Sequence, residues 1–351
     1  MTRALELAAR ALYTTDPNPR VGCVIANAEG VVGEGWHARA GDPHAEVMAL
    51  RAAGARARAA TVYVTLEPCS HTGRTPPCAD ALIAAGVSRV VCSTLDPFPK
   101  VAGAGAKRLM AAGIAVEVGL LADEARKLNA GFFSRFERGR PYVRLKLAMS
   151  LDGRTAPAGG GRTWISGEAS RADVQTWRAR SSAVLTGAGT VRIDNPQLNV
   201  RLNYGPWVRQ PLRVVLDTML RCPRDARIFE RNEALVFAAA EATLGAFKDV
   251  AVERVPRGDG GLDLDAVMQN LTAREVNELL VECGPTLAGA FIAKQLVDEL
   301  VLYVAPRLLG SDAAPLTRLT LGELRNLPEF EFREAQQIGE DVRLILKLKK
   351  S

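Results

Sequence analysis

Four residues near the start of the chain have side chains that could hold and use a metal ion. His44 and Glu46 stand two residues apart in the string PHAEVMAL, and Cys69 and Cys78 follow in EPCSHTGRTPPC. Pro43 disfavours helical geometry before it, so His44 is expected in the first turn of a helix, and Cys78 at the start of another. The partial positive charge at a helix N-terminus stabilises a thiolate, which is a better metal ligand than a thiol.

One histidine and two cysteines are the ligand set of a catalytic zinc rather than a structural one. Three protein ligands leave a fourth position open to water, and zinc lowers the pKa of such a water to about 7. Glu46 is not needed as a ligand, so its expected role is to carry the water proton to a ring nitrogen and then to a departing amine. H-x-E followed by P-C and a further cysteine is the pattern of zinc deaminases. Each residue alone is more often an ordinary polar or packed one, so a structural zinc, or no metal, stays open as the alternative.

The spacing of the two cysteines departs from that pattern, because nucleobase deaminases have two residues between them and this chain has eight. A nucleic-acid deaminase with an unrelated C-terminal domain is one alternative. Against it, the basic residues are scattered and aromatic residues make up only 5% of the chain, too few for a base-stacking platform. A non-catalytic zinc module is another alternative. It needs a fourth protein ligand, and near Cys69 and Cys78 the only candidate is His71.

The elements that must position these residues alternate between strands and helices. Strands are expected near residues 21–26, 30–36, 60–66, 88–94 and 115–120, and helices near 44–57, 76–86 and 104–113. A glycine is expected to end each of the three helices, namely Gly54, Gly86 and Gly113. Glycine is the usual signal of a helix C-terminus. The alternation predicts an α/β sheet with helices on both faces.

A polar segment with glycine and proline, residues 135–141, is expected to separate two domains, 1–140 and 141–351. A length of 351 residues also favours two domains. The second half repeats the α/β alternation and is expected to finish with antiparallel strands. Its strands are expected near 142–153, 183–189, 212–217, 234–240, 278–284, 299–306 and 342–350, and its helices near 170–181, 264–273 and 286–295.

Two features of the second half indicate a polar site at the end of one strand. The strand near 278–284 runs into Gly284, and Pro285 is expected at the first helical position, so free backbone N–H groups there could seat a phosphate. An ordinary strand-to-helix connection is the alternative, as an ordinary turn is for the loop TGAGTVRIDNP. Glu282 is a carboxylate inside an apolar strand and needs a partner, which favours a role in a site.

Composition limits the classes of partner and compartment. The formal net charge is +6, which suits nucleic acid and phosphorylated small molecules equally well. No apolar run is long enough to span a membrane and the first residues show no cleavable signal, so a soluble, cytoplasmic protein is expected. Six irregularly spaced cysteines indicate thiols rather than a disulfide framework. We expect a homo-oligomer without nucleic-acid or membrane partners.

Strings along nearly the whole chain resemble one family. They are NPRVGCVI, GEGWHARAGDPHAEVMAL, VTLEPCSHTGRTPPCADALI, DPFPKVAGAG, KLAMSLDGRTA, TWISG, TGAGTVRIDNPQLNVR, VECGPTLAGAF and VDELVLYVAPRLLG. These strings are similar to those of the bifunctional diaminohydroxyphosphoribosylaminopyrimidine deaminase and 5-amino-6-(5-phosphoribosylamino)uracil reductase of riboflavin biosynthesis. The eight-residue spacer that ends in GRTPPC is specific to that family.

The resemblance implies two folds and two activities. A cytidine-deaminase-like three-layer domain would cover residues 1–140, and a dihydrofolate-reductase-like α/β domain would cover 141–351. The first would use Zn²⁺ to deaminate 2,5-diamino-6-ribosylamino-4(3H)-pyrimidinone 5′-phosphate. The second would use NADPH to reduce the ribosyl side chain, giving 5-amino-6-ribitylamino-uracil 5′-phosphate. The residues alone leave NADH open, and a phosphorylated substrate accounts for the basic charge without nucleic acid.

Carried over position by position, the resemblance also assigns site residues. For the deaminase, His44, Cys69 and Cys78 match the zinc ligands, Glu46 matches the proton carrier, and Asn18, His71 and Arg74 match positions around the substrate. For the reductase, Lys146 and Glu282 match catalytic positions. The positions for NADPH are Ala148, Trp164, Thr190, Asp194, Gly284, Pro285, Thr286, Leu287, Ala288, Gly289 and Ala290. Those for the sugar phosphate are Arg162, Arg178, Leu198, Arg201 and Glu282. Solvated surface charge is the competing interpretation for Arg74 and for Lys146.

Overall fold

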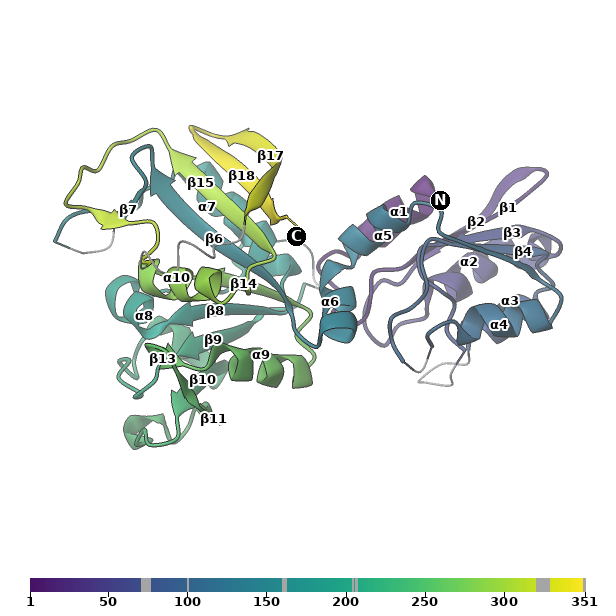
Figure 1. The fold of residues 1–351 in the computed structure, drawn as a ribbon. Helices are drawn as coiled ribbons and strands as arrows, with labels where there is room; N and C mark the ends of the chain where they lie inside the picture. The colour runs from purple at the N-terminus through teal and green to yellow at the C-terminus, as the bar shows by residue number, and fades with distance from the viewer. Residues whose placement is uncertain are drawn as a thin grey trace. The chain divides into compact units, whose positions relative to one another are not determined.

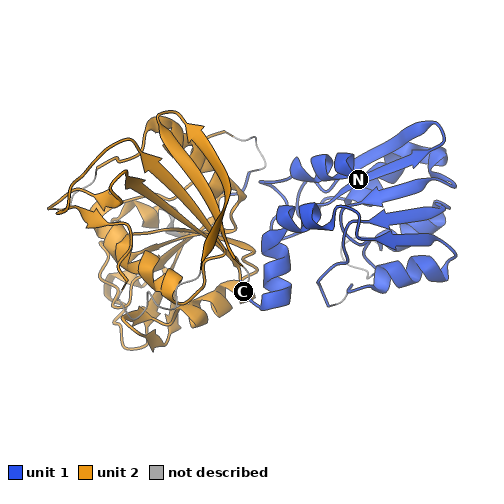
Figure 2. Ribbon diagram, turned by 45° about the horizontal axis from the view of Figure 1, so that its top comes forward, with its two compact units in different colours: residues 1–140, 204–209 blue, residues 141–203, 210–351 orange. Residues whose placement is uncertain are grey.

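The structure of the chain is a computed structural model. It describes residues 1–70, 77–99, 101–159, 163–203, 205, 208–319 and 329–349, without the side chains of Arg231 and Asn232. The chain divides into two compact units, of which the first comprises residues 1–140 with 204–209 and the second residues 141–203 with 210–351 (Figure 2).

The first unit is built on a sheet whose described strands follow the order β2-β1-β3-β4-β5. They are β1 (Gly22–Asn27), β2 (Gly30–Trp36), β3 (Thr61–Val64), β4 (Arg89–Cys92) and β5 (Ala115–Val118). Strand β1 is antiparallel to both of its neighbours, whereas β3, β4 and β5 are parallel. The helices are α1 (Thr2–Ala9), α2 (Ala45–Ala53), α3 (Cys78–Ala84), α4 (Ala104–Ala111), α5 (Ala122–Leu128) and α6 (Ala130–Arg138), with a 3-10 turn over Gly54–Ala57.

Helices cover both faces of this sheet, which gives the expected three layers (Figure 1). Helices α2, α3 and α4 bury alanine and leucine side chains against the face that carries Cys23 and Ile25. Helix α1 packs Ala4 and Leu7 against Val24, which points to the opposite face because successive strand residues alternate.

Two glycines in β2 allow α2 to lie directly on the sheet. A Cβ atom on Gly33 would overlap the carbonyl oxygen of Ala49, and one on Gly35 would overlap that of Ala45. Only glycine therefore fits at this close approach. The contact fixes the first turn of α2, which begins immediately after His44.

The second unit is built on a larger sheet whose described strands follow the order β11-β10-β9-β8-β14-β6-β15-β18-β17. They are β6 (Tyr142–Ser150), β8 (Ala183–Gly187), β9 (Leu212–Leu216), β10 (Ala234–Ala239), β11 (Ala251–Val255), β14 (Glu278–Glu282), β15 (Glu299–Ala305), β17 (Phe330–Ile338) and β18 (Asp341–Leu348). The strands from β11 to β15 are parallel, and β18 and β17 complete the sheet in antiparallel fashion. The antiparallel finish expected from the sequence is confirmed.

Helices pack on both faces of the larger sheet, as parallel sheets require. The helices are α7 (Glu168–Arg180), α8 (Ala188–Asp194), α9 (Leu264–Ala273) and α10 (Pro285–Ala293). Helices α9 and α10 cover the face that carries Leu279 and Val281, and α7 covers the face that carries Leu280. The smaller elements are two strand pairs, β7 (Arg154–Ala156) with β16 (Ala314–Pro315) and β12 (Arg257–Gly258) with β13 (Gly261–Leu262), and two 3-10 turns, Arg227–Asn232 and Gly245–Phe247.

The segment expected to be a polar hinge, residues 135–141, is helical in its first part. Helix α6 continues to Arg138 and ends at Gly139, which has a left-handed backbone (φ 67°). Phe132, Phe133 and Phe136 explain the difference, because they form one apolar side that packs with Leu66 and Phe98. The polar residues of the segment are the exposed side of that same helix.

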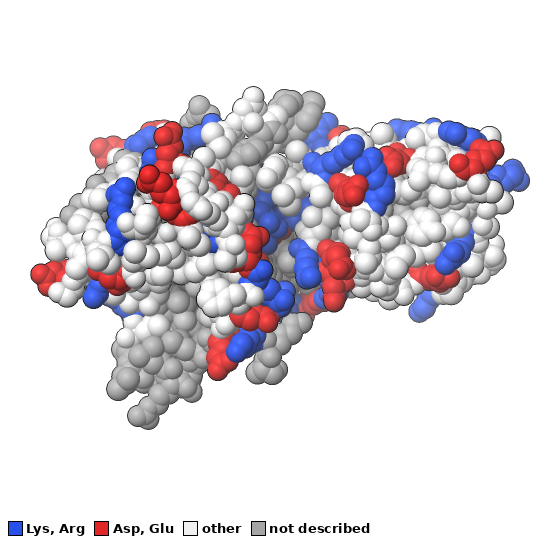
Figure 3. All heavy atoms as spheres, turned by 90° about the horizontal axis from the view of Figure 1, so that it is seen from above, with Lys and Arg blue, Asp and Glu red and all other residues white. Residues whose placement is uncertain are grey.

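The described surface carries basic and acidic side chains interspersed among uncharged ones, as the face in Figure 3 shows. Within the described residues, no helix has the length and apolar character that crossing a membrane would require.

Candidate functional site

Three metal-ligand side chains of the first unit converge from separate elements. His44 is the residue before α2, Cys78 is the first residue of α3, and Cys69 lies in the segment that follows β3. The His44 Nδ1 atom is 3.2 Å from the Cys78 Sγ atom and 3.6 Å from the Cys69 Sγ atom. The ligand atoms all lie within 4.8 Å of one another. Ligand atoms around a tetrahedral zinc, with bonds of about 2.0–2.3 Å, stand roughly 3.5 Å apart. The donor set and its spacing therefore fit a zinc ion.

The local structure around these ligands differs slightly from the expectation. His44 is extended (φ −69°, ψ 161°) and stands one residue before the helix rather than in its first turn. Strand β3 ends at Val64, five residues before Cys69, because the chain leaves the sheet and the backbone N–H of Glu67 instead donates to the carbonyl of Thr94. The position of Cys78 at the start of α3, after Pro77, is as expected.

The two thiols are electrostatically unequal. The pKa of Cys69 is lowered, first by a hydrogen bond from the Cys78 thiol and then by His44. The pKa of Cys78 is raised by the same hydrogen bond, because Cys78 keeps the shared proton, and by burial. The backbone N–H of Cys78 also donates to the Cys69 Sγ atom, at 3.3 Å. The arrangement thus favours a thiolate at Cys69, which is the charge that a cation requires.

Glu46 lies beside the three ligands without being one of them. It is in the first turn of α2, and its side chain is buried. Burial raises the pKa of Glu46 to about 7, with the nearby Cys69 raising it further and His44 lowering it. A carboxyl group with a near-neutral pKa can both accept and release a proton at physiological pH, as a proton carrier must.

A histidine that the sequence reasoning did not single out connects Asn18 to this centre. The His37 Nδ1 atom is 3.2 Å from the Pro43 carbonyl oxygen, and its Nε2 atom is 3.0 Å from the Asn18 Nδ2 atom. The carbonyl can only accept, so Nδ1 carries the hydrogen and Nε2 accepts from the Asn18 amide. Burial lowers the pKa of His37, which favours this neutral form. The His37 ring also meets the His44 ring edge-on, with centroids 5.4 Å apart.

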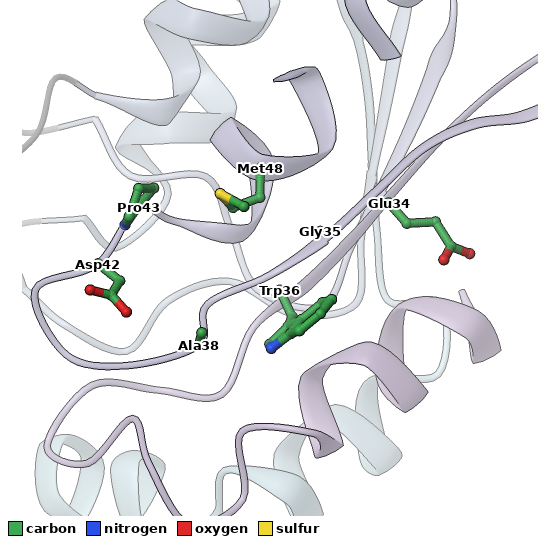
Figure 4. Close-up of a pocket in the computed structure, with 7 residues that line it drawn as sticks. All are labelled: Glu34, Gly35, Trp36, Ala38, Asp42, Pro43 and Met48. Carbon is green, nitrogen blue, oxygen red and sulfur yellow. The ribbon is translucent and has the colours of Figure 1, made fainter. Parts of the chain in front are cut away.

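A shallow cavity of about 150 Å³ opens beside the segment that leads to His44 (Figure 4). Its lining residues are Glu34, Gly35, Trp36, Ala38, Asp42, Pro43 and Met48. None of them was predicted as a site residue. Two of them reach the centre by hydrogen bonds, the Pro43 carbonyl to His37 and the Met48 N–H to the His44 carbonyl, the latter at 3.1 Å. The predicted substrate residues His71 and Arg74 lie outside the described residues.

A second cluster lies at the carboxyl ends of the central strands of the larger sheet. Glu282 is the last residue of β14 and is in register with Lys146 on the neighbouring strand β6. Its carboxylate accepts two hydrogen bonds from the Arg178 guanidinium, at 2.6 and 2.9 Å. Both side chains are about one-tenth exposed. The partner that a carboxylate in this strand required is therefore Arg178, itself a predicted site residue.

Further charged residues gather around this pair. Arg178, Lys146 and Arg201 all lower the pKa of Glu282, against the effect of its burial. Burial lowers the pKa of Lys146, while Glu282 and Asp194 raise it. The Lys146 ammonium also lies 5.7 Å from the centre of the Tyr303 ring. Five predicted residues of the reductase site thus share one electrostatic neighbourhood.

The predicted cofactor loops lie next to one another. Gly284 caps α10 with Pro285 at its first position, and a Cβ atom on Gly284 would be 3.7 Å from the Thr190 Oγ1 atom. A Cβ atom on Gly187, at the end of β8, would be 3.2 Å from the Leu287 side chain. Because β8 and β14 are adjacent and parallel, the loops that follow them meet at one edge of the sheet.

The remaining predicted residues have varied surroundings. Ala288 is fully buried and a Cβ atom on Gly289 would overlap the Arg318 carbonyl, so small residues are needed there for packing. Ala148, Leu198 and Ala290 pack against the two apolar cores. Trp164 is 53% exposed with the Arg171 guanidinium 4.8 Å from its ring centre, and Thr286 is exposed. Arg162 lies outside the described residues.

Comparison with known proteins identifies the family. The family profile described as the RibD C-terminal domain matches residues 141–344. The profile described as the cytidine and deoxycytidylate deaminase zinc-binding region matches residues 1–94. The chain is 50% identical over 358 residues to riboflavin biosynthesis protein RibD of Escherichia coli K12, covering 99% of this chain and 98% of that protein. This chain belongs to the RibD family.

Solved structures of RibD proteins have the same fold along their whole length. Acinetobacter baumannii RibD, form 1, is 45% identical with a TM-score of 0.92, and 99% of this chain and 98% of that chain are covered. The Thermotoga maritima diaminohydroxyphosphoribosylaminopyrimidine deaminase/5-amino-6-(5-phosphoribosylamino)uracil reductase is 33% identical with a TM-score of 0.86, covering 99% and 97%. The cytidine-deaminase-like and dihydrofolate-reductase-like folds expected from the sequence are confirmed.

Membership of the RibD family establishes the two activities. The protein is a bifunctional enzyme of riboflavin biosynthesis, with a zinc-dependent deaminase and an NADPH-dependent reductase. The deaminase and reductase activities, and the Zn²⁺ and NADPH that serve them, agree with the expectation from sequence.

Proposed function

We propose that this RibD protein deaminates 2,5-diamino-6-ribosylamino-4(3H)-pyrimidinone 5′-phosphate at the centre formed by His44, Cys69 and Cys78. It then reduces the ribosyl side chain of the product at the cluster around Lys146 and Glu282. The proposal rests on the three ligand atoms, which lie within 4.8 Å of one another beside the buried Glu46 carboxyl.

In the deaminase site, His44, Cys69 and Cys78 would hold the zinc ion. Bound zinc lowers the pKa of a water ligand to about 7 and so supplies a nucleophile at neutral pH. Glu46 would accept the proton of the attacking water, pass it to a ring nitrogen, and deliver a proton to the amine, which leaves as ammonia. Neutral His37 would hold the Asn18 amide in one orientation, so that its free oxygen can accept a hydrogen bond from the pyrimidinone. His71 and Arg74 are proposed to contact the same substrate.

When bound in the reductase site, NADPH would supply a hydride to the sugar C1′ carbon. Opening of the ribosyl ring breaks the C1′–O bond, and the ring oxygen then needs a proton. Lys146 would donate that proton, since burial lowers the pKa of its ammonium group. Glu282 would hold Lys146 and Arg178 in place, and Arg178, with Arg201, Leu198 and Arg162, would border the sugar phosphate.

The N-terminus of α10 is the proposed seat for a phosphate of NADPH. Its first backbone N–H groups are not used by the helix itself, and Gly284 allows a ligand to approach them closely. Thr190 beside Gly284 would be a further donor. The other positions proposed to surround NADPH are Ala148, Trp164, Asp194, Pro285, Thr286, Leu287, Ala288, Gly289 and Ala290.

Replacing Gly284 with valine is expected to raise the KM for NADPH about tenfold or more, with a much smaller change in kcat. The valine methyl groups would extend into the gap between Gly284 and Thr190 and cover the N–H groups of the helix start. Steady-state kinetics of the reductase step on the full-length protein measures both constants.

Two matched variants separate this effect from a general loss of structure. Gly284→Ala adds a Cβ atom at an ordinary contact distance of 3.7 Å from Thr190 and should have a small effect. Gly261→Val lies in the β12–β13 strand pair, where an added Cβ meets nothing within 4 Å, and should leave the KM unchanged. An unchanged KM for NADPH in soluble Gly284→Val protein would place the cofactor elsewhere.

Purified protein assayed on the diaminopyrimidinone ribotide tests the proposal as a whole. Without NADPH the expected products are ammonia and the deaminated ribotide, and with NADPH the expected product is the ribitylamino compound. Removal of zinc with a chelator should stop ammonia release and leave reduction of the deaminated ribotide intact. Ammonia release that persists without zinc would contradict the proposed centre.

We also propose the domain limits, compartment and assembly of the protein. The deaminase is assigned to residues 1–140 and the reductase to 141–351. This division is supported by the change of compact unit between Arg140 and Pro141, and residues 204–209 depart from it by clustering with the first unit. A cytoplasmic location is supported by six free cysteines, which a reducing compartment preserves. A homo-oligomer is supported by exposed apolar side chains that a subunit contact would cover, such as Leu308 (74%) and Phe332 (69%). Light scattering of the purified protein measures the oligomeric state.

A further inference from the structure

A second buried glutamate of the first unit, Glu67, is used neither as a ligand nor as a proton carrier. Its side chain is 3% exposed and stands two residues before Cys69. The carboxylate accepts three backbone hydrogen bonds, from the N–H groups of Asp96 (3.1 Å), Gly103 (2.9 Å) and Ala106 (3.0 Å). Each of these donors is separated from Glu67 by about thirty or more residues in the sequence.

Two of the three donors show that Glu67 caps helix α4 from outside the helix. Gly103 is the residue before α4, and its backbone is left-handed (φ 87°). As a glycine, it has no side chain that could cap the helix. The Glu67 carboxylate accepts the N–H of Gly103 and that of Ala106 in the first turn. A carboxylate at this end of a helix satisfies donors that the helix cannot, and its charge opposes the positive end of the helix dipole.

The start of α4 also contacts the backbone next to Cys69. A Cβ atom on Gly105 would overlap the carbonyl oxygen of Pro68 and would lie 3.2 Å from the Glu67 Oε1 atom. The helix start, Glu67 and Pro68 are thus in direct contact, and Pro68 is bonded to the ligand Cys69. Cys69 is held separately by α3, whose Cys78 and Ala79 N–H groups donate to its Sγ atom (3.3 Å) and its carbonyl oxygen (3.1 Å), so a shift of α4 would move Pro68 more than the ligand.

The third donor, Asp96, connects Glu67 with the turn that follows β4. Asp96 follows β4, and its Oδ1 atom accepts the N–H of Phe98 at 2.8 Å, which closes a tight turn. The Glu67 backbone N–H also donates to the Thr94 carbonyl in the same connection after β4, at 3.0 Å. Glu67 therefore holds the segment that follows β4 by two hydrogen bonds.

We propose that Glu67 is a positioning residue of the deaminase, which ties the Asp96 turn and the start of α4 to the backbone that carries Cys69. It holds these two segments in register next to the residues that lead to Cys69, and it takes no part in proton transfer. This inference rests on the proposed deaminase centre.

The test is Glu67→Gln in the full-length protein. The amide keeps one accepting oxygen and turns an N–H₂ group toward backbone N–H donors, so at least one of the three hydrogen bonds is lost. The expected result is a rise of about tenfold or more in the KM for the diaminopyrimidinone ribotide. Zinc content should stay at the wild-type value, and so should the pH dependence of kcat, because Glu67 carries no proton in the reaction.

Two matched variants distinguish positioning from helix stability. Asp263→Asn removes the charge of a comparable cap in the second unit, where Asp263 accepts the N–H groups of Asp265 and Ala266 at the start of α9. It should lower the Tm without changing the ribotide KM. Gly105→Ala forces α4 away from Pro68 while the chain keeps the Glu67 carboxylate, and it should raise the same KM as Glu67→Gln.

The outcomes separate this inference from the proposed centre. A Glu67→Gln protein with a lower Tm and an unchanged ribotide KM would show that Glu67 only stabilises α4. Loss of zinc in step with activity would show that Glu67 acts on the ligands, and it would equally overturn the inference. Failure of the centre itself would appear in the wild-type protein, as ammonia release that does not depend on zinc.

Discussion

Glu46→Gln is expected to abolish ammonia release while the protein keeps its zinc. The glutamine amide has nearly the same size but cannot accept a proton from the attacking water or deliver one to the leaving amine. General acid–base catalysis contributes about 10²–10⁴-fold to a rate, so kcat for deamination should fall by at least that factor. His44, Cys69 and Cys78 are unchanged, so metal analysis of the purified variant should give the wild-type zinc content.

The same preparation supplies the controls for this prediction. Reduction of the deaminated ribotide should proceed at the wild-type rate, since the reductase cluster lies on the other sheet. Glu117→Gln removes a carboxylate from the surface of the first unit and should leave deamination unchanged. Loss of zinc in parallel with activity would make Glu46 a ligand or a structural residue and would overturn its assigned role.

Cys78→Ser is expected to remove the metal and stop deamination while leaving reduction largely intact. A serine hydroxyl is a much weaker zinc ligand than a thiolate. Mutation of a residue that only hydrogen-bonds to a zinc ligand lowers the zinc affinity about 10–100-fold. Loss of a ligand itself should lower the zinc affinity further. Metal analysis, ammonia release and NADPH consumption on the deaminated ribotide give the three measurements.

Cys92→Ser is the matched control for Cys78→Ser. Cys92 is a fully buried thiol of the same unit, on β4, and is not one of the three ligands. It should lower stability to a similar extent and retain zinc. If reduction fell as far as deamination in soluble, folded Cys78→Ser protein, the proposed domain limit near residue 141 would be wrong.

The parts of the fold that could be predicted from sequence are those with strong local signals. Helix α9 begins and ends where expected, because the Asp263 side chain caps it and its apolar residues follow a helical period. Strand β2 also has the expected limits. The glycines that were taken as helix ends, Gly54, Gly86 and Gly113, all have positive φ angles.

Other elements were missed because their pattern depends on tertiary contacts. Helices α1, α5 and α8 are short, and each buries only a few side chains. Strand β17 has mostly exposed residues, including Glu331 and Arg333, and pairs with β18 alone at the edge of the sheet. No alternation of buried and exposed residues marks such a strand in the sequence.

The deaminase centre could be predicted more fully than its supports. His44, Glu46, Cys69 and Cys78 have residue types and spacings that specify a chemistry. His37 and Glu67 act through backbone carbonyl and N–H groups, which carry no residue type. The sequence offered one local signal for His37. Histidine is rare in this chain, with three in all, and His37 stands seven residues before the ligand His44.

Within the described residues, the two sheets share no strand. The strands of the smaller sheet all precede residue 141 and those of the larger sheet all follow it. Neither sheet takes a strand from the other, while residues 204–209, from beyond residue 141, cluster with the first unit. What the covalent linkage does fix is stoichiometry: each round of translation yields one deaminase and one reductase. The cell then makes the enzyme that consumes the deaminated ribotide in the same copy number as the enzyme that produces it, without matching two separate expression levels.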